Sequence, residues 1–404
     1  MNVLLINPPS PFLLNPMTFP PLGLLYLAAA LERYGHTAHV WDMNSKATPR
    51  FSPDLIGITS LTPHIPKLKR IVPQLKAQFV GVPIILGGPH FSNRSTDAFT
   101  LGADAVCIGD GEEAIEAALF GGRGTMNGFI DVDAWPMPAR HLLDLHAYSY
   151  KVGGKPATSI VTARGCAYSC AYCSRGPGND LLRNRAIPLV AKEVEAIKAL
   201  GFEGLQIYDD EVNISTRRLL ELCEALQGAQ VKWRCFVRAN LFTIEQARAM
   251  SEAGCVEVCC GVESGSEAIL KSMDKKATVA EASRARIFAS YYGMRFKAFC
   301  MIGLPGETEE TVLLTKQWLL DMKPDDFDLC PFTPYPGSLV GDHPERYDIQ
   351  IESGYWDEPI YHKGVLGQYR VTTRTSTLSA QRIAELHDSI ETEVRERLGL
   401  GRLV

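Results

Sequence analysis

A repeated alternation of strands and helices constrains this chain more than any other feature of its sequence. Between residues 157 and 345, short runs rich in apolar and β-branched residues each precede a longer helical stretch. Six such strands are expected, at 158–162, 204–208, 231–237, 256–260, 296–301 and 327–330. Strand–helix units of this kind build a parallel barrel or part of one. The chemistry of such a barrel lies at the carboxyl ends of its strands.

A second parallel sheet is expected in the first 125 residues. Its strands are predicted at 3–6, 38–42, 54–59, 83–88 and 105–109, with helical stretches between most of them. This order indicates a Rossmann-like, doubly wound α/β domain, whose ligands bind at the carboxyl ends of the strands. The connection at 44–53 leaves little room for a helix, so this domain is expected to be trimmed.

Three cysteines follow the first predicted barrel strand, Cys166, Cys170 and Cys173, at C-x3-C-x2-C spacing. Thiolates are the ligands of iron–sulfur clusters. Three thiolates cannot complete a four-iron cluster, so one iron would stay open to another ligand. Two other interpretations remain: buried cysteines that pack as small hydrophobes, and a zinc site, although no partner pair follows at finger spacing.

The cysteine motif, with the strand-end motifs after it, resembles the radical S-adenosylmethionine (SAM) enzymes. In that family the open iron of a 4Fe-4S cluster binds the amino and carboxylate groups of SAM. An electron from the cluster then cleaves SAM to a 5′-deoxyadenosyl radical. The resemblance also implies that the barrel is a partial, (βα)6 TIM-type barrel.

The same resemblance implies a role for each strand-end motif. It places Tyr172 near the adenine, Asp209 at the SAM amino group, Arg238 at the SAM carboxylate, Glu263 and Ser264 at the ribose and methionine end, and Ile302 beside the adenine through its backbone. Two alternatives stay open. Asp209 could instead cap the next helix, and Arg238 could be a surface arginine in a turn.

The first domain resembles the cobalamin (B12)-binding domain that precedes the barrel in one radical SAM subfamily. The residues expected to line cobalamin are Thr59, Ser60, Gly87, Gly88, Gly109 and Gly111. The D-x-H-x-x-G motif that supplies a lower cobalt-ligating histidine is absent, and His90 is the one proposed substitute, although a loop histidine is the commoner case.

Four segments are therefore expected: a cobalamin-binding-type domain at 1–125, a linker at 126–156, the radical SAM barrel at 157–345 and a tail at 346–404. The tail should carry an amphipathic helix at 378–398. Its aromatic residues Tyr355, Trp356, Tyr361 and His362 could close the open side of the barrel over a substrate.

The subfamily resemblance implies a cobalamin-dependent C-methyltransferase that acts on a small, natural-product-type molecule. Hydrogen abstraction from an unactivated carbon would be followed by methyl transfer from methylcobalamin, with an external electron donor such as flavodoxin or ferredoxin. One alternative is a cobalamin-free radical SAM dehydratase, epimerase or rearrangement enzyme with a vestigial first domain. Another is a non-catalytic metal-binding or sensing module, which would need only the cysteines.

The composition limits the kinds of partner that this chain is expected to bind. The net charge of −5 and the pI of about 6.0 give no basic footprint for nucleic acid. No apolar run is long enough to span a membrane. Eleven cysteines without a secretion signal indicate reduced thiols in the cytoplasm. Five of the cysteines fall on barrel strands: Cys235, Cys259, Cys260, Cys300 and Cys330. We expect them to be buried packing residues, and the alternative is a role in quenching radicals.

Overall fold

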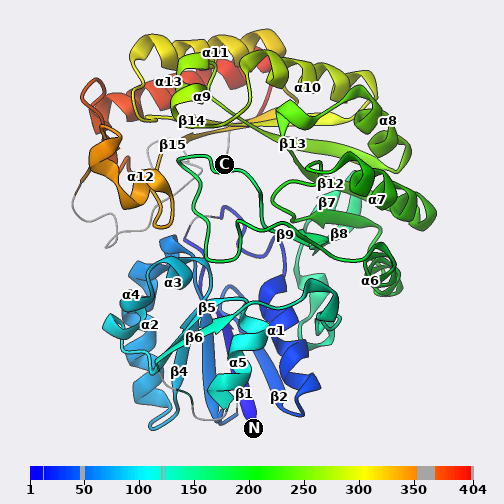
Figure 1. Cartoon of the computed structure of the whole chain (residues 1–404), viewed down its shortest axis with the longest axis vertical. Helices are drawn as coiled ribbons and strands as arrows, with labels where there is room; N and C mark the ends of the chain where they lie inside the picture. Colours follow the sequence, from blue (N-terminus) through cyan, green and yellow to red (C-terminus); the bar gives the residue numbers. More distant parts are fainter. Residues whose placement is uncertain (12, 46–50, 120–121, 123, 353–368, 402–404) are drawn as a thin grey trace. The chain divides into compact units, whose positions relative to one another are not determined.

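The computed structural model describes the 404-residue chain except for residues 12, 46–50, 120–121, 123, 353–368 and 402–404 (Figure 1). The four tail aromatics and part of the 44–53 connection therefore lie outside the described residues. The chain divides into two compact units. The amino-terminal unit holds Met1–Tyr150 and Arg175–Asn184, and the barrel unit holds Lys151–Ser174 and most of the chain from Arg185 onward.

The amino-terminal unit is built on a six-stranded parallel sheet with the order β2-β1-β3-β4-β5-β6. Its strands are β1 (Asn2–Asn7), β2 (Thr37–Asp42), β3 (Leu55–Thr59), β4 (Ile84–Gly87), β5 (Ala105–Gly109) and β6 (Gly124–Gly128). Its helices are α1 (Leu22–Arg33), α2 (Ile65–Gln78), α3 (Pro89–Asn93), α4 (Ser95–Thr100) and α5 (Gly111–Leu119). The predicted doubly wound fold is confirmed, whereas the edge strand β6 was not predicted.

Alternating apolar residues explain why helices cover both faces of this sheet. Val3 and Leu5 of β1 pack into one core cluster with α1 and α5, while Leu4 and Ile6 pack into another with α2, α3 and α4. Successive side chains of a strand point to opposite faces, so a run without polar interruptions must be buried on both sides. Three short 3₁₀ turns, Val132–Ala134, Arg140–Leu142 and Leu145–Ala147, follow β6 in the segment predicted as a linker.

The barrel unit contains a seven-stranded sheet with the order β15-β14-β13-β12-β11-β8-β7. Its strands are β7 (Lys151–Val152), β8 (Lys155–Ile160), β11 (Gly204–Ile207), β12 (Lys232–Val237), β13 (Cys255–Glu263), β14 (Arg295–Ile302) and β15 (Asp326–Pro331). All neighbours pair in parallel except the hairpin of β7 and β8. The six parallel strands are the predicted ones, so the partial barrel is confirmed.

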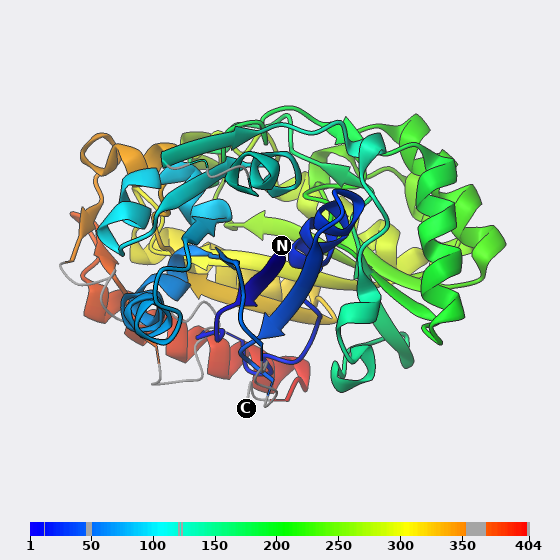
Figure 2. The same cartoon turned by 90° about the horizontal axis from the view of Figure 1, so that it is seen from below.

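Helices of the barrel unit alternate with these strands and lie along the outer face of the curved sheet (Figure 1). They are α6 (Ile187–Ala199), α7 (Thr216–Ala229), α8 (Ile244–Glu252), α9 (Glu267–Ser272), α10 (Val279–Tyr291), α11 (Glu309–Met322) and α13 (Ala380–Leu398). The short helix α12 (Leu339–Asp342) lies apart from this outer row (Figure 1). Helix α13, which matches the predicted tail helix, packs beside α11 and the edge strand β15 (red in Figure 2). Short strand pieces complete the description: β9 (Ala163–Arg164), β10 (Arg183–Asn184), β16 (Gln350–Ile351) and β17 (Thr373–Arg374).

The barrel strands show two chemically different faces. Residues that point to the helices are apolar and fully buried, and they include Cys235, Cys260 and Cys300. The alternate positions form what we call the inner face, which carries the polar and aromatic residues of the same strands together with Cys259 and Cys330. The helix-facing cysteines therefore act as small packing residues. Among the described residues, no helix is both long and apolar enough to cross a bilayer.

Candidate active site

The three motif cysteines lie on the loop that follows β8 and β9. The loop begins at Gly165, whose φ of +89° belongs to the left-handed region that favours glycine. Cys170 is buried, Cys166 is partly exposed and Cys173 is exposed. Within the described ranges, no three His, Cys, Asp or Glu side chains come close enough to share one metal ion. A four-iron cluster takes one thiolate at each iron.

The end of α9 and the segment from the end of β15 through α12 hold this loop in place. The Ala171 amide donates to the Met273 carbonyl at 2.9 Å, and the Val340 amide donates to the Ala171 carbonyl at 3.0 Å. The Ser174 hydroxyl donates to the Pro336 carbonyl at 2.5 Å. Pro336 belongs to the Pro-Tyr-Pro-Gly turn after β15, so one structural role of that motif is to fix the cysteine loop.

Arg238, at the carboxyl end of β12, points at the cysteine loop. Its Nη1 group lies 3.6 Å from the Cys170 sulfur, and its guanidinium carbon lies 3.6 Å from the centre of the Tyr168 ring. Asn213 holds its backbone on both sides, with bonds of 2.8 and 3.0 Å. Arg238 is only 2% exposed, yet its Nε and Nη2 groups have no hydrogen-bond partner among the described residues. A buried guanidinium with two unused donors is prepared for an anionic group.

Two carboxylates and a lysine complete the polar centre. The Lys275 ammonium binds Glu263 Oε1 at 2.7 Å and is almost fully buried. Glu211 Oε2 is buried and has no hydrogen-bond partner in the part of the chain that the structure describes. Burial raises the pKa of Glu211 to about 7, although the charges of Lys275 and Arg238 act in the opposite direction. Glu211 therefore offers one open acceptor oxygen beside two cations.

Glu263 adopts a conformation that is costly for a side chain with a Cβ atom. Its φ is +66°, at a register shift in the pairing of β13 with β14. A Cβ at Gly261 would stand 2.3 Å from Glu263 Oε1 and 2.9 Å from Lys275 Nζ. Strain of this kind persists only where the surroundings fix it, and it is common at functional sites. Glycine at position 261 thus makes room for the Glu263–Lys275 ion pair.

The other residues expected at the SAM site are mostly engaged with the protein itself. Asp209 accepts bonds from the amide and hydroxyl of Thr162, and burial raises its pKa to about 6. Ser264 lies between Glu307 and Thr315 at 3.5 and 3.4 Å. The Ile302 carbonyl accepts from the Phe332 amide at 2.7 Å. These contacts position the strand ends.

Tyr172 lies next to the polar centre. It packs against an apolar cluster that includes Ala171, Met273 and Leu304, and its ring centre is 5.9 Å from Lys275 Nζ. Burial, followed by the charge of Glu263, raises the pKa of Tyr172 well above its ordinary value. The structure thus brings Cys170, Tyr172, Arg238 and Glu263 together.

Sequence reasoning missed Glu211 and Lys275. Glu211 stands in the run Asp209-Asp210-Glu211, so its acidity was visible, but the backbone turn that selects one of three carboxylates was not. Lys275 follows Glu263 by twelve residues, after α9, and no periodic pattern links the two. Lys275 stands near other charged residues, Lys271, Asp274 and Lys276, so no sequence signal distinguishes it from them.

In the amino-terminal unit, the residues expected to line cobalamin lie at the carboxyl edge of the sheet. Thr59 ends β3, Gly87 ends β4 and Gly109 ends β5. A Cβ at Gly88, where φ is +95°, would stand 2.8 Å from the Ser60 amide nitrogen. A Cβ at Gly109, where φ is +80°, would stand 2.4 Å from the Gly128 carbonyl oxygen. Glycine is required at both positions because another part of the backbone passes too close to leave room for a Cβ atom.

Ser60 and Gly111 complete this edge. The Ser60 hydroxyl donates to the Leu61 carbonyl at 2.9 Å, and Gly111 begins α5. Between Gly109 and Gly111, the Asp110 carboxylate binds the Arg183 guanidinium at 2.5 Å and accepts from the Ile130 amide at 3.1 Å. The loop after β5 is therefore fixed by its own contacts.

His90, the one histidine considered as a cobalt ligand, has both ring nitrogens engaged. Nδ1 lies 3.0 Å from the Thr62 hydroxyl and Nε2 lies 3.3 Å from Asp97. Its side chain is fully buried, and burial lowers its pKa. These bonds fix the ring in the interior of the unit, which disfavours a role as a cobalt ligand.

Comparisons with known proteins agree with both units. Residues 16–119 match the B12 binding domain family, and residues 160–319 match the radical SAM superfamily. An uncharacterized methyltransferase of Pyrococcus horikoshii is 27% identical over 383 residues, which cover 85% of this chain and 83% of that protein. The anaerobic magnesium-protoporphyrin IX monomethyl ester cyclase of Rubrivivax gelatinosus is 25% identical, over 82% of this chain and 68% of that protein.

Among solved structures, the fold is similar to that of TsrM from Kitasatospora setae, a radical SAM methyltransferase with cobalamin and a 4Fe-4S cluster bound. The TM-score is 0.73 at 17% identity, over 98% of this chain and 88% of that one. This likeness establishes the fold of the whole chain. The two family matches, in this order along the chain, make it a radical SAM enzyme of the subfamily that carries an amino-terminal B12-binding domain.

Proposed function

We propose that this enzyme is a cobalamin-dependent methyltransferase that transfers a methyl group to a carbon atom of a small, natural-product-type molecule. The observation that carries the proposal is the presence of both cofactor-binding units in one chain that matches a methyltransferase over 85% of its length. A cobalamin-free dehydratase or epimerase would need only the barrel unit.

The polar centre of the barrel unit fits SAM. The amino-acid part of SAM carries one carboxylate and one ammonium group. The two unused donors of Arg238 suit the carboxylate, and the open Glu211 oxygen suits the ammonium. Glu263, held by Lys275, offers further carboxylate oxygen on the same side. We assign these residues, with Tyr172 near the adenine, to SAM binding.

The protein contributes ligands, orientation and a low-dielectric surrounding. Cys166, Cys170 and Cys173 would hold three irons of a 4Fe-4S cluster, which when bound supplies the electron that cleaves SAM. Arg238 touches Cys170 and would also face SAM, so one side chain couples cluster to ligand. Asp209 fixes the end of β8 through Thr162, four residues before Cys166, and so positions the cysteine loop.

Cobalamin would be held at the carboxyl edge of the amino-terminal sheet by the loops at Thr59–Ser60, Gly87–Gly88 and Gly109–Gly111. The residues present fit main-chain contacts at this edge and not ligation by His90, whose ring nitrogens are engaged. An external one-electron donor such as flavodoxin or ferredoxin would reduce the cluster. Free thiols at all eleven cysteines fit a reducing, cytoplasmic compartment.

The test uses the full chain, reconstituted without oxygen with iron, sulfide and hydroxocobalamin, and incubated with SAM and a low-potential reductant. We expect 5′-deoxyadenosine, the product of radical cleavage, and S-adenosylhomocysteine, the product that methyl loss leaves. The Cys170→Ala variant should form no 5′-deoxyadenosine. If the wild type forms no more 5′-deoxyadenosine than this variant, the proposal that this enzyme cleaves SAM to a radical is wrong. If 5′-deoxyadenosine forms without cobalamin-dependent S-adenosylhomocysteine, the enzyme is not a methyltransferase.

A further inference from the structure

Three aromatic rings form a row on the inner face of the barrel sheet. Tyr208 follows β11, Phe236 lies on β12 and Phe299 lies on β14. The ring centres of Tyr208 and Phe236 are 6.3 Å apart with 29° between the ring planes. Those of Phe236 and Phe299 are 6.0 Å apart with 31° between the planes. We call these three residues the aromatic shelf. Their neighbours Cys235 and Val237 point to the helices and are fully buried, which shows that the rings point the other way.

The shelf spans β13, the strand that lies between β12 and β14. Gly261 pairs with Phe299 in the parallel register of β13 and β14. Phe236 pairs instead with Cys259, two residues before Gly261, so the two rings lie diagonally across β13 and come together although their strands are not neighbours. The side chains of a core layer would be fully buried, and these three rings are not. Tyr208 is 44% exposed, and Phe236 and Phe299 remain partly accessible.

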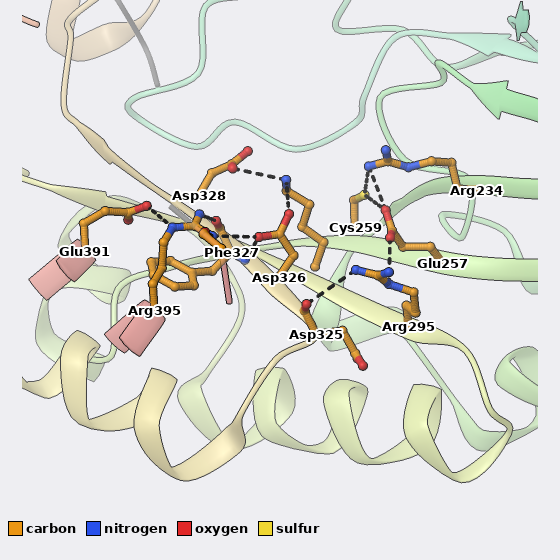
Figure 3. A network of polar contacts seen from close by, with 12 residues as sticks. Arg234, Glu257, Cys259, Arg295, Asp325, Asp326, Phe327, Asp328, Glu391 and Arg395 are labelled. Atoms are coloured by element: carbon orange, nitrogen blue, oxygen red, sulfur yellow. Dashed lines mark hydrogen bonds and ion pairs between the residues drawn. The ribbon is translucent and has the colours of Figure 1, made fainter. Parts of the chain in front are cut away.

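A layer of paired charges lies on the same strands, toward their amino-terminal ends: Arg234 precedes Phe236 by two residues, and Lys297 precedes Phe299 by two. Figure 3 shows the polar network to which Arg234 belongs. Lys297, whose Nζ is 5.9 Å from the Phe299 ring centre, binds Asp326 at 2.7 Å and Asp328 at 3.1 Å. Arg234 binds Glu257 at 3.0 Å. Because each of these charged groups has an oppositely charged partner, the layer does not require an ionic group from a ligand on the shelf. The rings themselves are the exposed binding surface.

Two residues of the shelf stand close in the sequence to residues of the proposed SAM site. Phe236 precedes Arg238 by two residues on the inner face of β12, and Arg238 contacts Cys170. Tyr208 likewise stands three residues before Glu211. A radical formed on SAM can take a hydrogen atom only from a group in near contact with it. A substrate group must therefore occupy the space next to these residues.

We infer that the aromatic shelf binds the substrate, and that the part of the substrate it binds is a flat, uncharged aromatic or conjugated ring system. Rings at about 6 Å with small interplanar angles present successive faces and edges, which favour stacked and edge-to-face contact with another flat ring. A puckered, saturated skeleton would touch such a surface at fewer points. This inference rests on the proposed function for the identity of the site, and it adds the substrate class.

The test compares two neutral probes with the same carbon skeleton, flat 2-naphthol and saturated decahydro-2-naphthol. Binding to the full-length protein is measured by saturation-transfer NMR in the presence of saturating SAM, so that the adenine position is filled. We expect 2-naphthol to bind at least about fivefold more tightly than its saturated partner. Phe236→Leu and Phe299→Leu should each weaken 2-naphthol binding by about threefold to tenfold, with little effect on the saturated probe.

Two further variants keep the test sharp. Tyr208→Leu should weaken 2-naphthol binding while Tyr208→Phe, which keeps the ring, should not. Tyr291→Leu removes a ring that is 75% exposed on α10, outside the shelf, and should leave both probes unaffected. Equal binding of the two probes, or 2-naphthol binding that survives the shelf substitutions in folded protein, would overturn the inference. Because the readout is binding, a failure of SAM cleavage would be seen separately and would not imitate either result.

Discussion

At the scale of single residues, Arg238 is the sharpest test of the SAM site. Its two unused donors have no other partner among the described residues, and a hydrogen bond to a charged group is worth about 1.5–3 kcal/mol. Arg238→Met keeps much of the length and removes the donors. We expect the dissociation constant of SAM, measured by calorimetry on the reconstituted protein, to rise about tenfold to one hundredfold.

The matched control is Arg217→Met, because Arg217 lies on the outer helix α7 with a side chain that is 90% exposed. Its substitution should leave the SAM affinity unchanged. Arg238→Lys separates charge from geometry: a single ammonium cannot reproduce the planar fork, so it should recover only part of the affinity. Full affinity in Arg238→Met would show that the SAM carboxylate is held elsewhere.

His90 supports a second prediction at this scale. Since Thr62 and Asp97 engage both ring nitrogens, His90→Gln should not change how cobalamin is coordinated. The cob(II)alamin electron paramagnetic resonance spectrum of the wild type should lack nitrogen splitting from a protein imidazole, and the variant should give the same spectrum. Its melting temperature should fall by a few degrees, because a buried pair of bonds is lost. Nitrogen splitting that disappears in His90→Gln would contradict this assignment.

The residue scale is also where prediction from the sequence reached its limit. Cys170, Arg238 and Glu263 were visible because each follows a strand within a recognisable motif. The choice of Glu211 over Asp209 as the open carboxylate depends on which side chain reaches Thr162, and no spacing rule encodes that contact. Lys275 enters the site from a turn after α9, so its position became clear only from the folded chain.

At the scale of elements, the turn between β14 and α11 depends on one buried carboxylate. Glu307 is fully buried and accepts from the Gly303 amide at 2.7 Å and the Leu304 amide at 3.1 Å. Burial raises its pKa from 4.5 to about 7, although these bonds act against the shift. The folded state therefore binds this proton more tightly than the unfolded chain does. Stability linked to Glu307 is complete below about pH 4.5 and is lost as the pH rises to about 7.

The predicted readout is the difference in melting temperature between Glu307→Gln and the wild type. A neutral amide does not titrate, so this difference should become more favourable to the variant between pH 5 and about pH 7.5, by an amount that corresponds to about 3 kcal/mol at most. Glu310→Gln, at an exposed position of α11, should show no such trend. If this difference in melting temperature does not change with pH, the folded protein does not raise the pKa of Glu307, and the prediction is wrong.

Elements were predicted well where local chemistry and packing agree. Helices α8, α10 and α11 each begin after a threonine whose hydroxyl accepts the amide three residues later, and all three were expected near these positions. Strand β6 was missed because Gly124-Thr125-Met126-Asn127-Gly128 has little intrinsic preference for extended structure. It is a strand because β5 offers it an edge, which is information that a local segment does not contain.

At the scale of the whole molecule, the two cofactor sites use residues of different units. The three cysteines that we propose as cluster ligands belong to the barrel unit, and the loops that we propose to line cobalamin belong to the amino-terminal unit. Each unit also has apolar core clusters of its own, so the integrity of one metal site does not require the other. The two metals should therefore be separable by substitution in the intact chain.

Metal analysis after anaerobic reconstitution tests this separation. The wild type should hold about four irons and about one cobalt per chain. Cys170→Ala should lose most of the iron and keep the cobalt, whereas Cys223→Ala, which removes a buried thiol from the outer helix α7, should keep both. Iron without cobalt in the wild type would make the amino-terminal unit a scaffold and favour cobalamin-free radical chemistry. Loss of cobalt together with iron in Cys170→Ala would mean that cobalamin binding depends on the loaded barrel unit, so that the two units act as one site.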